Sequence, residues 1–277
     1  MRRGPVPQPP LDLAAQLMRA YRAMVRSWAD WLEAHVLAAW DQNLPLSPAR
    51  TDAPGDRIDR LMGQAESAWA QPPQQDISKV ATGVSARNLR ETQGMIRAYS
   101  PTGVYQGRRA NKTLQDQPTR GTIKGISLKG VVDSAALKGF QTRNADLIRG
   151  LRKKTNARVR ETLEKAYESG MRIDDLRRKL ADELGIAESK ADLIARDQVL
   201  KLNGDLTEER QRQAGIETYQ WSTSGDERVR DMHADLDGTI QSWDDPPVTN
   251  EQGETNHPGQ DVGGCRCVAI PILPELQ

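Results

Sequence analysis

Residues 209–221 read ERQRQAGIETYQW, and they contain the change of pattern that decides the fold class. Upstream of this stretch, apolar side chains recur every three or four residues, which is the spacing of an amphipathic helix. Gly215 ends that pattern, because glycine accepts the left-handed backbone that commonly follows a helix. From Ile216 to Trp221 apolar and polar residues alternate, which is typical of a β-strand. The sequence therefore predicts a long helix that leads directly into a small sheet.

Toward the N-terminus the helical pattern covers most of the chain. Helices are predicted over Leu11–Trp40, Arg57–Gln71 and Ala86–Tyr99, and from Val131 onward with ends at Gly170, Gly185 and Gly215. The segment from Ser100 to Gly130 is predicted to be irregular, with turns in GTIKGISLKG. The predicted fold class is α+β, with mostly helical N-terminal and middle regions and a small C-terminal α+β module.

The first predicted helix carries an apolar stripe. The residues on this stripe follow alternating steps of three and four: Met18, Tyr21, Val25, Trp28, Leu32 and Ala39, with His35 at the remaining position. Such a stripe needs a partner surface in the chain or in another subunit, and packing into the core is the expectation. His35 is accordingly expected to be a buried histidine with satisfied ring nitrogens.

Proline and glycine mark the expected boundaries between regions. They concentrate in MRRGPVPQPP at the start, in Leu44–Asp56 and in Gln71–Gln75, which indicates an extended arm and two linkers. The predicted organisation has three parts. Residues 1–43 form the arm and a Trp-rich helix, residues 44–130 form a linker-rich region with short helices, and residues 131–277 form one domain.

The charge of the chain is unevenly distributed, although its net value is only +1. Residues 106–178 contain 18 Lys and Arg against 8 Asp and Glu, whereas residues 226–261 contain 2 against 10. Such asymmetry indicates interaction surfaces. Arg152, Lys153 and Lys154 are the candidate contacts to nucleic acid in the basic stretch. The alternative is that the basic residues only form solvated helix faces.

The start of the chain leads into a mixed helix without an apolar signal segment, and no apolar run approaches the roughly 20 residues that span a bilayer. We therefore expect a soluble protein made in a reducing cytoplasm, without a membrane partner. In that compartment the two cysteines are expected to be free or metal-bound instead of disulfide-bonded.

The C-terminal region places most of the metal-binding side chains of the chain close together. Ser224 and Glu227 have the spacing of a capping box, so a helix is predicted from Gly225 to Leu236, with His233 in its second half. Residues 239–264 are predicted to be an acidic loop. The stretch CRCVAIPIL then has strand character, which directs Cys265 and Cys267 to the same face.

His233, His257, Cys265 and Cys267 are the candidate metal ligands. Thiolates and imidazoles bind Zn²⁺ tetrahedrally, and four protein ligands close the coordination shell. The predicted site is therefore a structural zinc pin and not a catalytic centre. The alternative is that the histidines only pack or hydrogen-bond and the cysteines are small buried apolar groups. A cysteine nucleophile is disfavoured, because the acidic loop would raise the pKa of a thiol.

In the order of its residues, the C-terminal half resembles the phage Mu F-like family of head morphogenesis proteins, or minor head proteins. The resemblance covers about residues 135–272. Its positions are Ala195, Arg196, Ala214, Gly215, Tyr219, Trp221, Asp226, Arg228, Val229, Arg230, His233, Leu236, Asp237, Gly238, His257, Pro258, Cys265, Arg266 and Cys267. The chain departs from the family pattern in the GQDVGG segment between HP and CRC, which is longer than usual.

The resemblance implies a non-enzymatic component of the phage virion, present at low copy and associated with the portal and the capsid interior during head assembly. The implied partners are the portal protein, the major capsid or scaffolding protein and packaged DNA, bound without sequence specificity. The implied location is the phage head, and the host cytoplasm during assembly. The alternative is a metal-dependent nuclease or toxin-like effector packaged in the head, which would use His233, Asp237 and His257.

Overall fold

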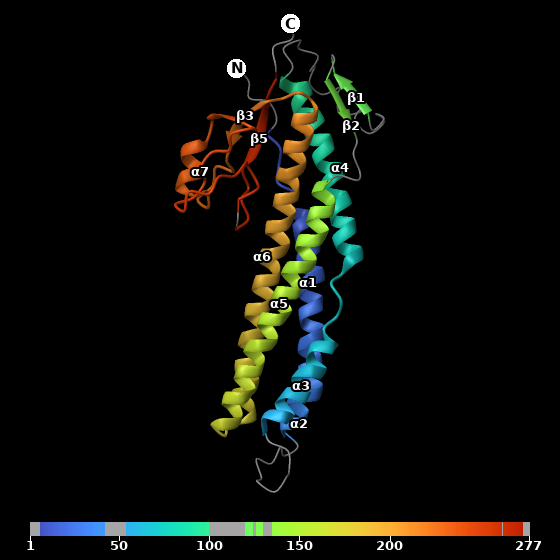
Figure 1. Cartoon of the computed structure of the whole chain (residues 1–277), viewed down its shortest axis with the longest axis vertical. Helices are drawn as coiled ribbons and strands as arrows, with labels where there is room; N and C mark the ends of the chain where they lie inside the picture. Colours follow the sequence, from blue (N-terminus) through green and yellow to red (C-terminus); the bar gives the residue numbers. More distant parts are fainter. Residues whose placement is uncertain are drawn as a thin grey trace. The chain divides into compact units, whose positions relative to one another are not determined.

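The computed structural model describes residues 6–41, 54–99, 120–123, 126–129, 135–261 and 263–273. This part of the chain is mostly helical, with a three-stranded antiparallel sheet near its C-terminal end (Figure 1). The predicted α+β fold class is therefore confirmed. In chain order the elements are α1 (Leu11–Leu32), a π-helix η1 (Glu33–Leu37), α2 (Ala38–Asp41), α3 (Pro54–Ala68), α4 (Gln74–Tyr99), β1 (Arg120–Ile123), β2 (Ile126–Lys129), α5 (Ala135–Glu168), α6 (Ile173–Gln213), β3 (Thr218–Ser222), α7 (Asp231–Leu236), β4 (Ile240–Ser242) and β5 (Val268–Ile272).

The chain divides into two compact units, each built from segments that are distant in sequence. Unit 1 combines residues 1–14, 78–141 and 196–277, and unit 2 combines residues 15–77 and 142–195. Each unit thus draws on all three of the sequence segments that were expected to be separate parts. That three-part division stays a prediction about domains.

Unit 2 is a set of packed helices with aromatic side chains in its core, where α1, α5 and α6 run side by side (Figure 1). Trp28 is fully buried and stacks on Trp69 with ring centroids 4.4 Å apart, and its indole N–H donates to the carbonyl of Ala65 at 2.8 Å. The hydroxyl of Tyr21 donates to Asn144 at 2.6 Å. The apolar stripe of the first helix therefore packs into the core, as expected for Trp28 and Tyr21.

The expectation for His35 was wrong, and the π-helix explains why. A π-helix adds a residue to the turn, so the residues after Glu33 are rotated relative to the α-helical pattern. Val36 becomes buried in place of His35. The His35 side chain is exposed and stacks on Trp31, and its Nδ1 lies 2.9 Å from the backbone carbonyl oxygen of Trp31.

Other helix ends differ in informative ways. Gly170 and Gly215 follow α5 and α6 with φ angles of +62° and +76°, so both predicted ends are confirmed. Gly185 was expected to end a helix, but that prediction was wrong: it lies inside α6 and does not have the positive φ of Gly170 and Gly215. The predicted short helices correspond to α3 and α4, and α4 is longer than expected because it begins at Gln74. The GTIKGISLKG segment contains the paired strands β1 and β2 in place of turns alone.

Unit 1 contains the small sheet, with strand order β4-β3-β5. Alternation along β3 buries Tyr219 and Trp221 on one face, where they form a core cluster with Trp243 and the two cysteines. Gln211, on the last turn of α6, donates to the carbonyl of Ala269 at 3.0 Å and accepts from the indole of Trp243 at 3.2 Å. The end of the long helix is therefore fixed directly to the sheet. No described helix is long and apolar enough to cross a membrane.

The segment between β3 and β5 is less helical than predicted. The helix expected from Gly225 to Leu236 is reduced to α7, which begins at Asp231. Ser224 does not form a capping box with Glu227, because its hydroxyl bonds to Asp226 at 3.3 Å and Gly225 has a φ of +68°. The acidic segment that follows contains the short strand β4.

Candidate metal centre

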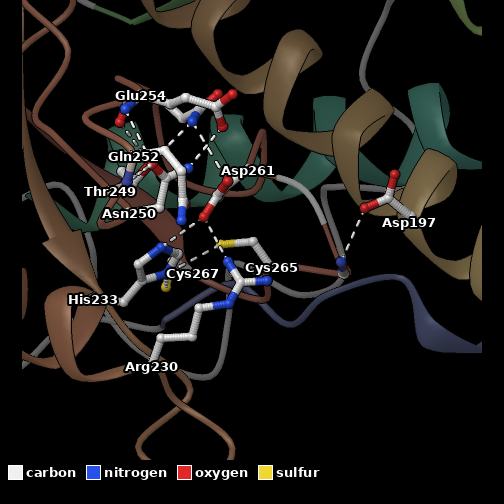
Figure 2. Close-up of polar contacts among 12 residues, drawn as sticks. Asp197, Arg230, His233, Thr249, Asn250, Gln252, Glu254, Asp261, Cys265 and Cys267 are labelled. Carbon is white, nitrogen blue, oxygen red and sulfur yellow. Dashed lines mark hydrogen bonds and ion pairs between the residues drawn. The ribbon is translucent and has the colours of Figure 1, made fainter.

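Three of the four predicted ligands converge in the core of unit 1. Nδ1 of His233 lies 3.4 Å from the sulfur of Cys267 and 3.6 Å from the sulfur of Cys265 (Figure 2). One donor atom of each of the three residues lies within 4.8 Å of the other two. All three side chains are buried, with exposed fractions of 3% for His233 and 6% for each cysteine.

Two structural elements present these donors. His233 comes from α7, and the cysteines come from the extended segment just before β5, where residues two apart face the same way. Gly264 precedes this segment with a φ of +80°, and its N–H donates to Asp197 of α6 at 2.9 Å (Figure 2). Arg266, between the cysteines, forms a two-pronged ion pair with Asp226 at 2.5 and 2.6 Å. These contacts hold the two thiols toward the core.

A buried carboxylate lies on the other side of the histidine ring. Oδ2 of Asp261 is 3.0 Å from Nε2 of His233 and 2.5 Å from a guanidinium nitrogen of Arg230. Its other oxygen accepts from Asn256 at 3.4 Å, and its side chain is only 1% exposed. His233 is thus held between two thiols and one carboxylate.

The close contact of the two thiols shifts their pKa values in opposite directions. The hydrogen bond from Cys267, assisted by His233 and opposed by burial, lowers the pKa of Cys265 to about 5. The same contact and burial raise the pKa of Cys267. The pKa of His233 is raised, chiefly by its hydrogen bond to Cys265. The cluster therefore stabilises one thiolate beside an imidazole.

His257, the fourth predicted ligand, lies in a different environment. Its Nδ1 is 2.9 Å from the hydroxyl of Tyr219, and its ring packs against Trp243 with centroids 4.8 Å apart. Burial lowers the pKa of His257. Within the described residues, the one group of three or more possible metal ligands is His233 with the two cysteines. The structure thus does not bring His257 to the predicted centre.

The residues of the alternative nuclease site are also not assembled. Asp237 accepts from the backbone N–H and the hydroxyl of Thr223, at 2.7 and 3.1 Å, while His233 faces Asp261 and His257 faces Tyr219. Each of the three side chains expected to share a catalytic metal therefore bonds to a separate partner.

The predicted nucleic-acid contacts lie on α5 in unit 2. Arg152 is half-buried, stands 5.8 Å from the ring centroid of Trp69 and donates to the carbonyl of Glu66 at 3.0 Å. Lys153 and Lys154 are exposed. The first two of these basic residues line a groove of about 650 Å³ between α3 and α5, together with Asp59, Glu66, Arg149 and Arg160, among others.

The geometry of the thiol and imidazole donors fits a tetrahedral zinc ion. Zn–S bonds of about 2.3 Å and Zn–N bonds of about 2.05 Å, at the tetrahedral angle, separate sulfur from nitrogen by about 3.6 Å. The observed separations are 3.4 and 3.6 Å. A tetrahedral ion would take a fourth donor from outside this trio, so the closed four-ligand shell expected from sequence is not assembled by the protein residues seen here.

Sequence reasoning missed Asp261, Arg230 as its partner, and Asp197. Asp261 lies in the GQDVGG segment, and only its position between two candidate ligands could have drawn notice. Arg230 is one of the positions that carry the family resemblance and Asp197 directly follows another, Arg196, but no local pattern indicates which atoms they contact.

The C-terminal region is therefore a long helix that leads into a small sheet, with a buried Cys₂His cluster in the core of the sheet. Residues 157–270 match the family described as phage Mu protein F like protein, so this part of the chain is similar to that family. The resemblance identified from the residue order is therefore confirmed.

One relative with an appreciable match comes from Haemophilus influenzae and is described as an uncharacterized protein. It is 41% identical over 130 residues, which is 47% of this chain and 28% of the relative. The chain thus spans well under two thirds of the relative's length. No solved structure matches the chain.

Proposed function

We propose that the chain is a structural component of a phage head that acts in head morphogenesis. The observation that carries this proposal is the family match over residues 157–270. The arrangement of the site supports a structural role, because the side chains that would serve a nuclease bond to separate partners. In this proposal the protein is present at low copy in the virion, is made in the host cytoplasm and binds the portal protein and the major capsid or scaffolding protein.

A binding assay tests the proposed partners. Purified full-length chain is mixed with portal oligomers of the same phage and sedimented, and the chain is expected to travel with the portal. Sedimentation with capsid or scaffolding protein tests the second contact in the same way. A chain that stays in the supernatant with every head protein, from low to moderate salt, contradicts the proposal.

We further propose that the Cys₂His cluster holds a zinc ion as a structural pin, because all three ligands are buried, at 3% and 6% exposed, and out of reach of a substrate. The zinc would be bound by His233, Cys265 and Cys267, and would link α7 to the segment before β5. Such a link stabilises the folded state because the ion binds the folded chain far better than the unfolded one. Elemental analysis of chain purified without chelator is expected to find zinc, and a chelator is expected to lower the melting temperature. Chain without zinc, even after incubation with it, contradicts the pin.

We also propose that exposed lysines of α5 contact packaged DNA. Lys153 and Lys154 are exposed on a helix within a stretch rich in basic residues, whereas Arg152 is occupied by Trp69 and Glu66. Contacts of lysine with phosphates are electrostatic and independent of sequence, so they weaken steeply with salt.

A further inference from the structure

We infer that Asp261 is a positioning residue of the metal centre, and that Arg230 holds its carboxylate against His233. The inference rests on the zinc site proposed above. Its basis is that the two nitrogens of one ring face opposite partners, with Nδ1 toward both sulfurs and Nε2 toward Oδ2 of Asp261 at 3.0 Å (Figure 2).

This contact selects one form of the imidazole. An ionised carboxylate only accepts hydrogen bonds, so the ring proton belongs on Nε2. In the neutral ring Nδ1 then carries a lone pair, and that lone pair points at the thiols. Metal-binding histidines commonly donate their other N–H to a carboxylate, which orients the ring and raises its basicity. Asp261 therefore prepares His233 to bind a metal through Nδ1.

Arg230 offsets the free-energy cost of burying the Asp261 carboxylate. Asp261 is 1% exposed, and a charge buried to this degree needs a close partner. Arg230 supplies it at 2.5 Å while 41% of its own side chain stays exposed. The His233 ring also forms a T-shaped contact with the ring of Trp221, with centroids 5.5 Å apart and ring planes at 78°. The ring is thus fixed in both position and tautomer.

The same order of thiol, imidazole and carboxylate occurs in enzymes with a cysteine nucleophile. Two observations favour the metal. Both sulfurs share one ring nitrogen, at separations that suit a tetrahedral ion, whereas a nucleophile needs one thiol. Both cysteines are also 6% exposed, which keeps them from a substrate. A cysteine nucleophile is therefore the alternative that the experiments must distinguish from a metal site.

The first experiment measures zinc affinity in the full chain by competition with a chromophoric chelator. Asp261→Asn keeps the shape but removes the charge, and is expected to weaken zinc binding by about 10- to 100-fold with unchanged stoichiometry at saturation. Asp261→Glu is expected to recover part of the loss. Asp244→Asn is the matched control, because this exposed carboxylate also pairs with an arginine but lies outside the cluster. Its affinity should equal that of the original chain.

Arg230→Gln is the second variant, and it leaves both Asp261 and the ligands in place. It is expected to weaken zinc binding by a smaller factor than Asp261→Asn, so the inference stays testable if Asp261→Asn fails to fold.

The second readout is the tautomer, which a purely structural role of Asp261 would not set. Nitrogen-15 spectra of the zinc-loaded chain are expected to show the proton of His233 on Nε2 and the metal on Nδ1. Zinc on Nε2, or unchanged affinity in both the Asp261→Asn and Arg230→Gln variants, overturns the positioning role and leaves the zinc site standing. Failure of the original chain to bind zinc removes the site itself, and rapid alkylation of a cysteine that depends on Asp261 would then favour the nucleophile.

Discussion

His233 and His257 lie in the same core region, and their surroundings separate their roles. His233 sits between thiols and a carboxylate, which is a metal-binding environment. His257 meets the hydroxyl of Tyr219 and the ring of Trp243, with its pKa lowered by burial. A buried neutral histidine with an aromatic shell contributes packing and hydrogen bonds to its neighbours.

His257→Ala is therefore expected to destabilise the chain by about 2 kcal/mol, because it opens a cavity and leaves a buried hydroxyl without its partner. The zinc content of the folded variant should not change. Urea unfolding measures the first quantity and elemental analysis the second. Loss of zinc from a folded His257→Ala chain would restore His257 as the fourth ligand.

At the scale of elements, α6 contains two glycines that differ in whether the structure has room for a Cβ atom. Gly185 is exposed, and a Cβ there would meet nothing within 4 Å. At Gly204 a Cβ would lie 2.9 Å from the backbone oxygen of Pro258 and 3.2 Å from Gly259, so this helix and the loop before the cysteines touch backbone to backbone. Only Gly204 is required by the packing.

Gly185→Ala is expected to stabilise the chain by about 0.5 to 1 kcal/mol, because alanine favours the helix. Gly204→Ala is expected to destabilise it by about 1 to 3 kcal/mol through overpacking. The two substitutions are chemically identical and serve as controls for each other in urea unfolding. Equal effects would mean that the loop does not lie against α6 at Gly204.

Helices α4 and α6 are joined by buried polar side chains. The amide of Asn88 donates to Thr207 at 2.7 Å and accepts from Arg210 at 2.5 Å, and Arg210 also donates to Ser85 at 2.9 Å. Burial lowers the pKa of Arg210 to about 10, since this arginine has polar but uncharged partners in these contacts.

Asn88→Ala should cost about 2 kcal/mol of unfolding free energy, because it removes an acceptor from a buried guanidinium. Lys79→Ala, at an exposed site on the same helix, is the control and should change it by no more than about 0.5 kcal/mol. An Asn88→Ala chain as stable as the control would show that this contact is not a significant tie between the two helices.

At the scale of the whole molecule, the proposed DNA contact depends on basic side chains that are exposed and not on those that take part in packing. The double variant Lys153→Ala/Lys154→Ala is expected to bind duplex DNA more weakly and to reduce the salt slope of log affinity by about 2. Lys79→Ala/Lys190→Ala removes the same charge at exposed sites outside the basic stretch. Gel shifts over a salt series measure both. Equal losses in the two variants would mean that only net charge matters.

Local patterns in the sequence were sufficient for the α+β class, the helix end at Gly215, the strand that holds Tyr219 and Trp221, and the paired cysteines. These features depend on neighbouring residues, whose spacing is visible in the chain. The tertiary structure decided which histidine joins the cysteines, placed Asp261 behind it and turned His35 outward at the π-helix. The contacts of His233 with Asp261 and the two cysteines join residues 28 to 34 positions apart, and only the folded path of the chain sets which of them meet.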